Sequence, residues 1–217
     1  QKLGHAHITL KDCKEFLKTL ETYSLYRPAR KRYPRNTIMS NYCGEIMQID
    51  IMDMQRNREE NDGYLYALLS YDTYSKYLSS YPLRDRKPES VIAALADLVA
   101  NLPFSITNIY WDKEGSFISR RVQNWLKAND IANYTTTSQV KAPSVERVIR
   151  TIRLAIARFY KLTGTQRWID FLPSFVSNYN NRDHSTTKLK PIDLATDTLL
   201  IVPNLSKVGT RKRKRSI

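Results

Sequence analysis

Apolar and polar residues alternate along the chain in two periods, which predict an order of strands and helices. Between residues 45 and 83, three short segments rich in branched and aromatic residues predict strands, and an Asn61-Asp-Gly63 turn separates the first two. The predicted strands are 47–52, 64–71, 76–83, 105–110 and 131–136, and the predicted helices are 88–101, 116–128, 143–163 and 168–179. This order predicts an α/β fold with a mixed sheet flanked by helices.

The helix that begins at Pro143 has two distinct faces. Five apolar residues recur on one side at spacings of three and four, which predicts a buried stripe: Val145, Ile149, Ile152, Ile156 and Phe159. Glu146, Arg150 and Arg153 fall together on another side of the same helix. A carboxylate beside guanidinium groups suits metal and phosphate binding, but on the helix alone the commoner interpretation is an exposed ion pair between Glu146 and Arg150.

Two further acids stand at positions that favour chemistry. Asp50 lies in the middle of the first strand, against strand propensity, on the face opposite to Ile49 and Ile51. Asp53, near the end of that strand, is its rival. Asp112 follows the fourth strand, at the carboxyl end where ligands gather in open α/β sheets, with Glu114 as a neighbouring alternative. These acids are candidates for a metal site.

The segments outside the core are short and basic. We predict a small helical attachment in residues 1–25, containing a helix over 9–20, then a linker over 26–44, a core over 45–197 and a basic tail over 198–217. In the linker, prolines exclude regular structure around the basic residues Arg30, Lys31 and Arg32. The linker is either simply solvated or also follows DNA phosphates.

Net charge narrows the class of partner. The chain of 217 residues has a formal net charge of +14, which indicates a polyanionic partner. Its 41% hydrophobic content supports a folded core. No apolar run approaches the roughly 18 residues that a membrane span requires, so no membrane partner is expected. Two cysteines, Cys13 and Cys43, are too few for a disulfide framework and favour a reducing compartment.

Several local strings occur in the order found in one family. They are Met47-Gln-Ile-Asp50, Tyr71-Asp-Thr-Tyr-Ser-Lys-Tyr77, Trp111-Asp112, Pro143-Ser-Val-Glu146, and Tyr179-Asn-Asn-Arg-Asp-His-Ser185 followed by Pro191. With the order of elements, they resemble the ribonuclease H-like catalytic core of retroviral integrases and related transposases, although Met47 replaces a usual tryptophan. The form of the Lys141–Arg147 string and of the linker is most similar to integrases of Maverick or Polinton type.

The resemblance implies a fold, a reaction and a site. It implies a ribonuclease H-like five-stranded sheet and an Mg²⁺-dependent polynucleotidyl transferase that trims 3′ ends of element DNA and joins them to target DNA. Asp50, Asp112 and Glu146 would be the catalytic residues and would hold two Mg²⁺ or Mn²⁺ ions, with Asp50 bridging them. Lys141, Arg150 and Arg153 would bind DNA phosphates, as would the linker residues Arg30, Lys31 and Arg32.

The resemblance also implies partners and a compartment. Joining two DNA ends in a coordinated way requires a dimer or higher oligomer on double-stranded DNA. The run Arg211-Lys-Arg-Lys-Arg215 is typical of nuclear import or of a nonspecific DNA tail, so we expect a nuclear protein that is cytoplasmic before import. Two alternatives remain open: a domesticated or accessory DNA-binding protein with the same fold, and a plain ribonuclease H-like nuclease.

Overall fold

The structure, a computed structural model, describes residues 9–19, 38–111, 115–135, 143–197 and 199–200. The chain divides into two compact units, residues 1–36 and 37–217. In the first unit, helix α1 (Leu10–Thr19) confirms the predicted N-terminal helix. Thr9 and Asp12 cap it reciprocally, because the Thr9 N–H donates to Asp12 Oδ2 (2.8 Å) and the Asp12 N–H donates to Thr9 Oγ1 (3.2 Å).

The second unit is built on a five-stranded mixed sheet with the order β3-β2-β1-β4-β5. Its strands are β1 (Met47–Asp53), β2 (Tyr66–Asp72), β3 (Leu78–Leu83), β4 (Asn108–Trp111) and β5 (Ala132–Thr135). β1 is central and pairs antiparallel with β2 and parallel with β4. β2 and β3 are also antiparallel, whereas β4 and β5 are parallel. The predicted mixed sheet of five strands is thereby confirmed.

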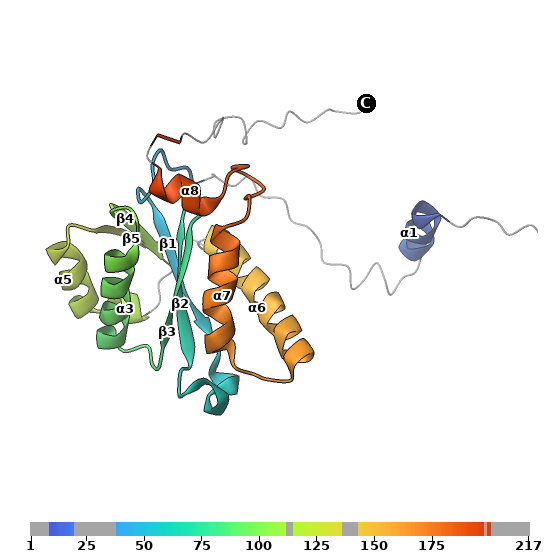
Figure 1. Ribbon diagram of the computed structural model, residues 1–217, viewed down its shortest axis with the longest axis horizontal. Helices are drawn as coiled ribbons and strands as arrows, with labels where there is room; N and C mark the ends of the chain where they lie inside the picture. The colour runs from blue at the N-terminus through green and yellow to red at the C-terminus, as the bar shows by residue number, and fades with distance from the viewer. Residues whose placement is uncertain (1–8, 20–37, 112–114, 136–142, 198, 201–217) are drawn as a thin grey trace, which may run out of the picture. The chain divides into compact units, whose positions relative to one another are not determined.

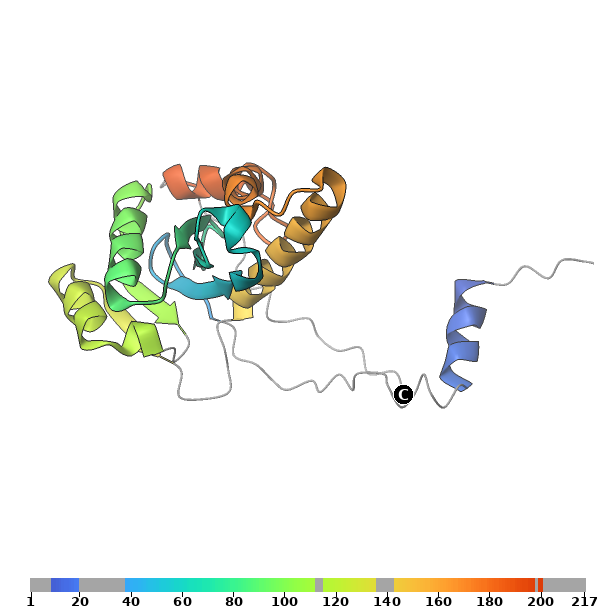
Figure 2. The same ribbon diagram turned by 90° about the horizontal axis from the view of Figure 1, so that it is seen from below.

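Helices cover both faces of this sheet (Figure 1). α3 (Pro88–Asn101), α4 (Gly115–Ile118) and α5 (Arg120–Ala128) lie on one face, and α6 (Pro143–Thr163) and α7 (Trp168–Asn180) lie on the other. The view in Figure 2 shows the same three layers edge-on. Met47, Ile49 and Ile51 of β1 join the core under α3 and α5, while Met52 joins the core under α6 and α7. The two faces of β1 therefore point into different layers.

Several elements differ from the sequence prediction. The predicted helix 116–128 is broken, because Ser119 has an extended ψ of 141° and its Oγ accepts from the Val122 N–H (3.3 Å), which starts α5 afresh. β4 starts at Asn108 rather than at residue 105. A short helix, α8 (Pro191–Thr196), was not predicted; its Leu194 is buried against Tyr74.

The long connection between β1 and β2 carries two short 3₁₀ helices, η1 (Gln55–Asn57) and η2 (Glu59–Asn61). Asn61 is buried and fastens this connection to the start of α7, since its Nδ2 donates to Gln166 O (2.9 Å) and its Oδ1 accepts from the Ile169 N–H (3.2 Å). Within the described ranges, no helix has both the length and the apolar character to cross a bilayer.

Candidate active site

Asp50 lies at the centre of the sheet and faces α6. It is half-buried in a strand whose neighbouring positions are buried, and it alternates with Ile49 and Ile51, which point to the opposite layer. Its Oδ1 accepts a hydrogen bond from the Ile51 N–H at 2.8 Å. The predicted orientation of Asp50, opposite to the isoleucines, is confirmed.

Glu146 reaches the same place from α6. Val145, Ile149 and Ile152 bury the apolar stripe of this helix against the sheet, as the spacing predicts. Glu146, in the first turn, is half-buried, and together with Asp50 it lines a cavity of about 290 Å³. Ile51, Ile149, Arg150 and Arg153 complete the lining. Two carboxylates from distant parts of the chain thus share one cavity with two guanidinium groups.

The ion-pair alternative for Glu146 is wrong in this structure. Glu146 and Arg150 are both described, yet no ion pair joins them, and the Glu146 carboxylate has no hydrogen-bond partner among the described residues. Arg150 and Arg153 are exposed at the rim of the cavity. The carboxylate is therefore available to a cation, and the two arginines are available to a phosphate.

The third predicted acid, Asp112, lies outside the described residues, as do Lys141 and the linker residues Arg30, Lys31 and Arg32. Trp111, the last described residue before Asp112, pairs with Ile49, the neighbour of Asp50. In the described part of the chain, no cluster of three or more His, Cys, Asp or Glu side chains is found. The described donors, two carboxylates in one cavity, fit a hard divalent cation such as Mg²⁺, which accepts few protein ligands.

Of the two rival acids, Glu114 lies outside the described residues and Asp53 has a structural role, as does Asp72. Asp53 is exposed, and its two carboxylate oxygens accept from the backbone N–H (3.0 Å) and the side-chain Nε2 (2.8 Å) of Gln55. Asp72 is fully buried and accepts from the Gly44 N–H (2.9 Å) and from the N–H and Oγ of Ser75 (both 2.6 Å). Burial raises the pKa of Asp72. Asp72 therefore caps the turn that leads from β2 to β3.

A second cavity adjoins the first through Arg153, which lines both. Its other walls come from the end of β1, from η1 and from the middle of α6, and they include Asp53, Arg56 and Tyr160. Burial raises the pKa of the Tyr160 phenol to about 12, so this hydroxyl stays protonated. Arg153 thus stands between the two cavities.

Sequence reasoning gave no role to Gln48, two residues before Asp50. Its side chain is fully buried and faces α6, and its Oε1 accepts from the backbone N–H groups of Ser144 (3.1 Å) and Val145 (3.2 Å). The available signal was an amide residue between two apolar residues of a strand, and that signal does not reveal a partner so distant in the sequence.

Comparison with known proteins agrees with this geometry. Residues 42–141 match the Integrase core domain family. A transposon-derived protein of Caenorhabditis elegans is 28% identical over 141 residues, which cover 65% of this chain and 49% of that protein. The chain therefore spans about half the length of this curated relative.

Solved structures show the same fold. A chain of the simian T-cell lymphotropic virus intasome, in complex with the PP2A regulatory subunit B56 gamma, superposes with a TM-score of 0.68 at 16% identity, covering 91% of this chain and 70% of that one. The HTLV-2 integrase catalytic core domain in complex with magnesium (dimeric form) gives 0.58 at 16% identity, covering 71% and 97%. The fold is ribonuclease H-like, as predicted, and the comparisons together support an integrase-type core.

Proposed function

We propose that this protein is a metal-dependent DNA integrase that trims the 3′ ends of element DNA and joins them to target DNA. The observation that carries the proposal is the shared cavity in which Asp50 of β1 and Glu146 of α6 lie beside Arg150 and Arg153. The match to the Integrase core domain family and the transposon-derived relative support the same conclusion.

Asp50, Asp112 and Glu146 would hold two Mg²⁺ or Mn²⁺ ions. Such a pair supplies activation of the attacking oxygen and stabilisation of the leaving oxygen of a phosphodiester. The protein's own side chains position the ions and the DNA. The carboxylates fix the ligand positions, β1 holds Asp50 rigidly between buried neighbours, and Arg150 and Arg153 bind the phosphates beside the reacting one. Lys141 and the linker residues Arg30, Lys31 and Arg32 would extend this phosphate contact.

The experiment that tests this function uses labelled duplexes that carry the terminal sequences of the encoding element, incubated with the protein and Mg²⁺. We expect shortened 3′ ends followed by products joined to target DNA, and we expect Asp112→Asn and Glu146→Gln to abolish both. Shortened products alone would favour a nuclease. Binding without any product would favour an accessory DNA-binding protein, and joining by Asp112→Asn would overturn the site assignment.

Assembly and compartment follow from the same proposal. An integrase that joins two DNA ends works as a dimer or higher oligomer on double-stranded DNA. The basic run Arg211–Arg215 lies outside the described residues, and we propose that it directs the protein to the nucleus. Removal of this run from a fluorescent fusion should then leave the protein in the cytoplasm.

A further inference from the structure

Gln48 occupies a position where an amide side chain is unfavourable for stability. It is fully buried on the face of β1 that packs against α6, and its Nε2 has no hydrogen-bond partner among the described residues. An unsatisfied buried donor costs folding free energy, and an apolar residue of the same size would avoid that cost. The contacts of its oxygen must therefore explain what the residue contributes.

The oxygen of Gln48 caps a helix from outside. The first N–H groups of any α-helix lack acceptors within the helix, and α6 begins at Pro143, which has no N–H. Ser144 and Val145 carry the next two N–H groups, and both donate to Gln48 Oε1, at 3.1 and 3.2 Å. Because the two donors fix the orientation of the amide, the first turn of α6 is bonded to β1 near the start of the strand.

Two carboxylates belong to residues that are close in sequence to these two hydrogen bonds. Asp50 follows Gln48 by two residues on the same face of β1, and Glu146 follows Val145 in α6. The bonds from Gln48 thus join the element that carries one carboxylate to the element that carries the other. The neighbouring packing of Val145, which is fully buried, holds the same turn against the sheet.

We propose that Gln48 is a positioning residue that sets the separation of Asp50 and Glu146 before a metal ion binds. The inference rests on the proposed function, since it concerns the same site. Gln48 acts through Ser144 and Val145 and contacts no reacting atom. Without its oxygen, both carboxylates remain, but the first turn of α6 is held to the sheet by packing alone, and binding of a cation must then complete its ordering.

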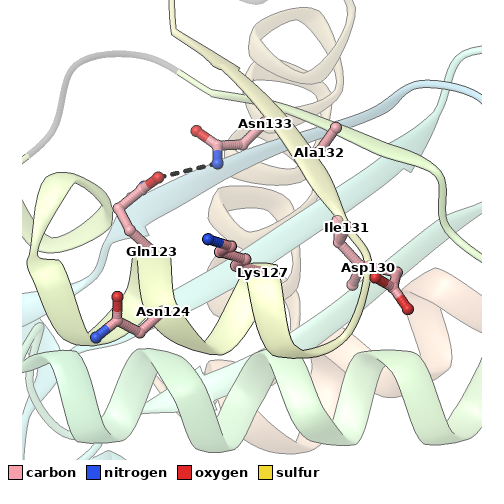
Figure 3. Close-up of a pocket in the computed structure, with 7 residues that line it drawn as sticks. All are labelled: Gln123, Asn124, Lys127, Asp130, Ile131, Ala132 and Asn133. Carbon is pink, nitrogen blue, oxygen red and sulfur yellow. Dashed lines mark hydrogen bonds between the residues drawn. The ribbon is translucent and has the colours of Figure 1, made fainter.

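The test uses two substitutions and a matched control. Gln48→Met keeps the length of the side chain and removes the acceptor, whereas Gln48→Glu keeps an acceptor oxygen at the helix N-terminus. The control is Gln123→Met on α5 (Figure 3), where Gln123 Oε1 accepts from Asn133 Nδ2 (2.9 Å) and Nε2 donates to Phe117 O (2.8 Å). This control loses comparable bonds on the opposite side of the sheet from α6.

The first measurement is backbone hydrogen exchange in the metal-free protein. In the wild type, we expect the Ser144 and Val145 amides to exchange more slowly than those of Glu89 and Ser90, because α3 also starts with proline but has no side-chain cap. Gln48→Met should remove this protection, while Gln48→Glu and Gln123→Met should keep it. Equal exchange at both helix starts in the wild type would overturn the proposal without any variant.

The second measurement is the Mg²⁺ concentration that gives half of the maximal thermal stabilisation, which needs no DNA. We expect Gln48→Met to raise it about tenfold, in the range known for partners that orient metal ligands, and Gln48→Glu to raise it less. An unchanged Mg²⁺ requirement, with a melting temperature lowered as in Gln123→Met, would reduce Gln48 to a structural role. Failure of the wild type to join DNA, with these results intact, would instead count against the proposed function.

Discussion

The two faces of the sheet are formed by the same strands, but only the α6 and α7 side has polar side chains of β1 between its buried apolar residues. On the α3 and α5 side, Met47, Ile49 and Ile51 enter a core closed by aliphatic residues and by Trp111 stacked on Phe117 (4.6 Å between ring centroids). On the α6 and α7 side, the intervening positions of the same strand are Gln48 and Asp50. The comparison indicates that one face fixes the strand, so that the other can hold groups that are costly to bury.

The largest expected effect is a loss of activity when Asp50, on the α6 side of β1, is replaced. Asp50→Asn removes a proposed metal ligand, so DNA joining should fall by more than the roughly 10–100-fold that loss of an outer partner produces. Asp53→Asn is the matched control, because Asp53 lies on the same strand and is exposed. Joining assays and melting curves of both variants check this, and equal losses of activity would remove the distinction between the two acids.

The next effect concerns the stability of the core on the α3 and α5 side of the sheet. Leu95 is fully buried on α3, so Leu95→Ala should lower the free energy of unfolding by about 2–5 kcal/mol through lost burial and a cavity. Urea denaturation measures this change. The Mg²⁺ requirement should not move, and a shift in it would show that the two faces are coupled rather than separate.

A smaller loss is expected at the outer edge of β3. Asn180 of α7 takes the place of a neighbouring strand, because its Oδ1 accepts from the Leu78 N–H (2.9 Å) and its Nδ2 donates to Leu78 O (2.8 Å). Asn180→Ala should lower the free energy of unfolding by about 1–3 kcal/mol. The adjacent exposed Asn181→Ala is the control and should change it little, as urea denaturation of both would show.

A weaker effect should appear in DNA binding. Arg150→Gln and Arg153→Gln should each reduce the slope of log affinity against log salt by about 1, because each removes one phosphate contact. Arg121→Gln, an exposed arginine on α5 that pairs with Glu89, should leave the slope unchanged. Binding titrations at several salt concentrations check this, and the same slope in all variants would exclude these arginines from the interface.

The smallest expected effect is a pH dependence near the end of α7. Burial, and then the charge of Lys76, lower the pKa of His184, whose ring packs edge-on against Tyr179. Because the folded-state pKa lies below the unfolded one, His184 stabilises the fold above about pH 6.5 and this contribution falls as the pH drops through the folded pKa. Unfolding measured between pH 7.5 and 5 should be less pH-dependent in His184→Gln, and an unchanged dependence would contradict the assignment.

Much of this arrangement could be predicted from local pattern. Pro143 and Gly164 bracket α6 as the spacing of its apolar residues predicts, and Pro88 starts α3. The features that escaped prediction depend on distant partners. Gln48 bonds to Ser144, Asn180 bonds to Leu78, and α8 gains its stability by burying Leu194. Periodicity reports which face is buried, and it carries no information about which buried polar groups meet.

The same limit applies to the candidate site. Two acids could be named as site candidates from the sequence: Asp50 because it goes against strand propensity, and Glu146 because it lies on the charged face of α6. The structure brings both into one cavity. On the helix alone, an exposed ion pair of Glu146 with Arg150 was the commoner interpretation of the same pattern. Only the packing of α6 on β1 decides between them, because it places Glu146 in the cavity that Asp50 also lines.

Gly44 shows how the absence of a side chain lets two neighbouring segments of the chain approach closely. Its φ of +80° already favours glycine, and a Cβ there would lie 1.9 Å from Ser105 O. The Thr107 N–H donates to Gly44 O (2.8 Å) just before β1 and β4 begin to pair. Gly44 therefore lets the two segments approach closely before β1 and β4 pair, and Gly44→Ala would push the starts of these two strands apart.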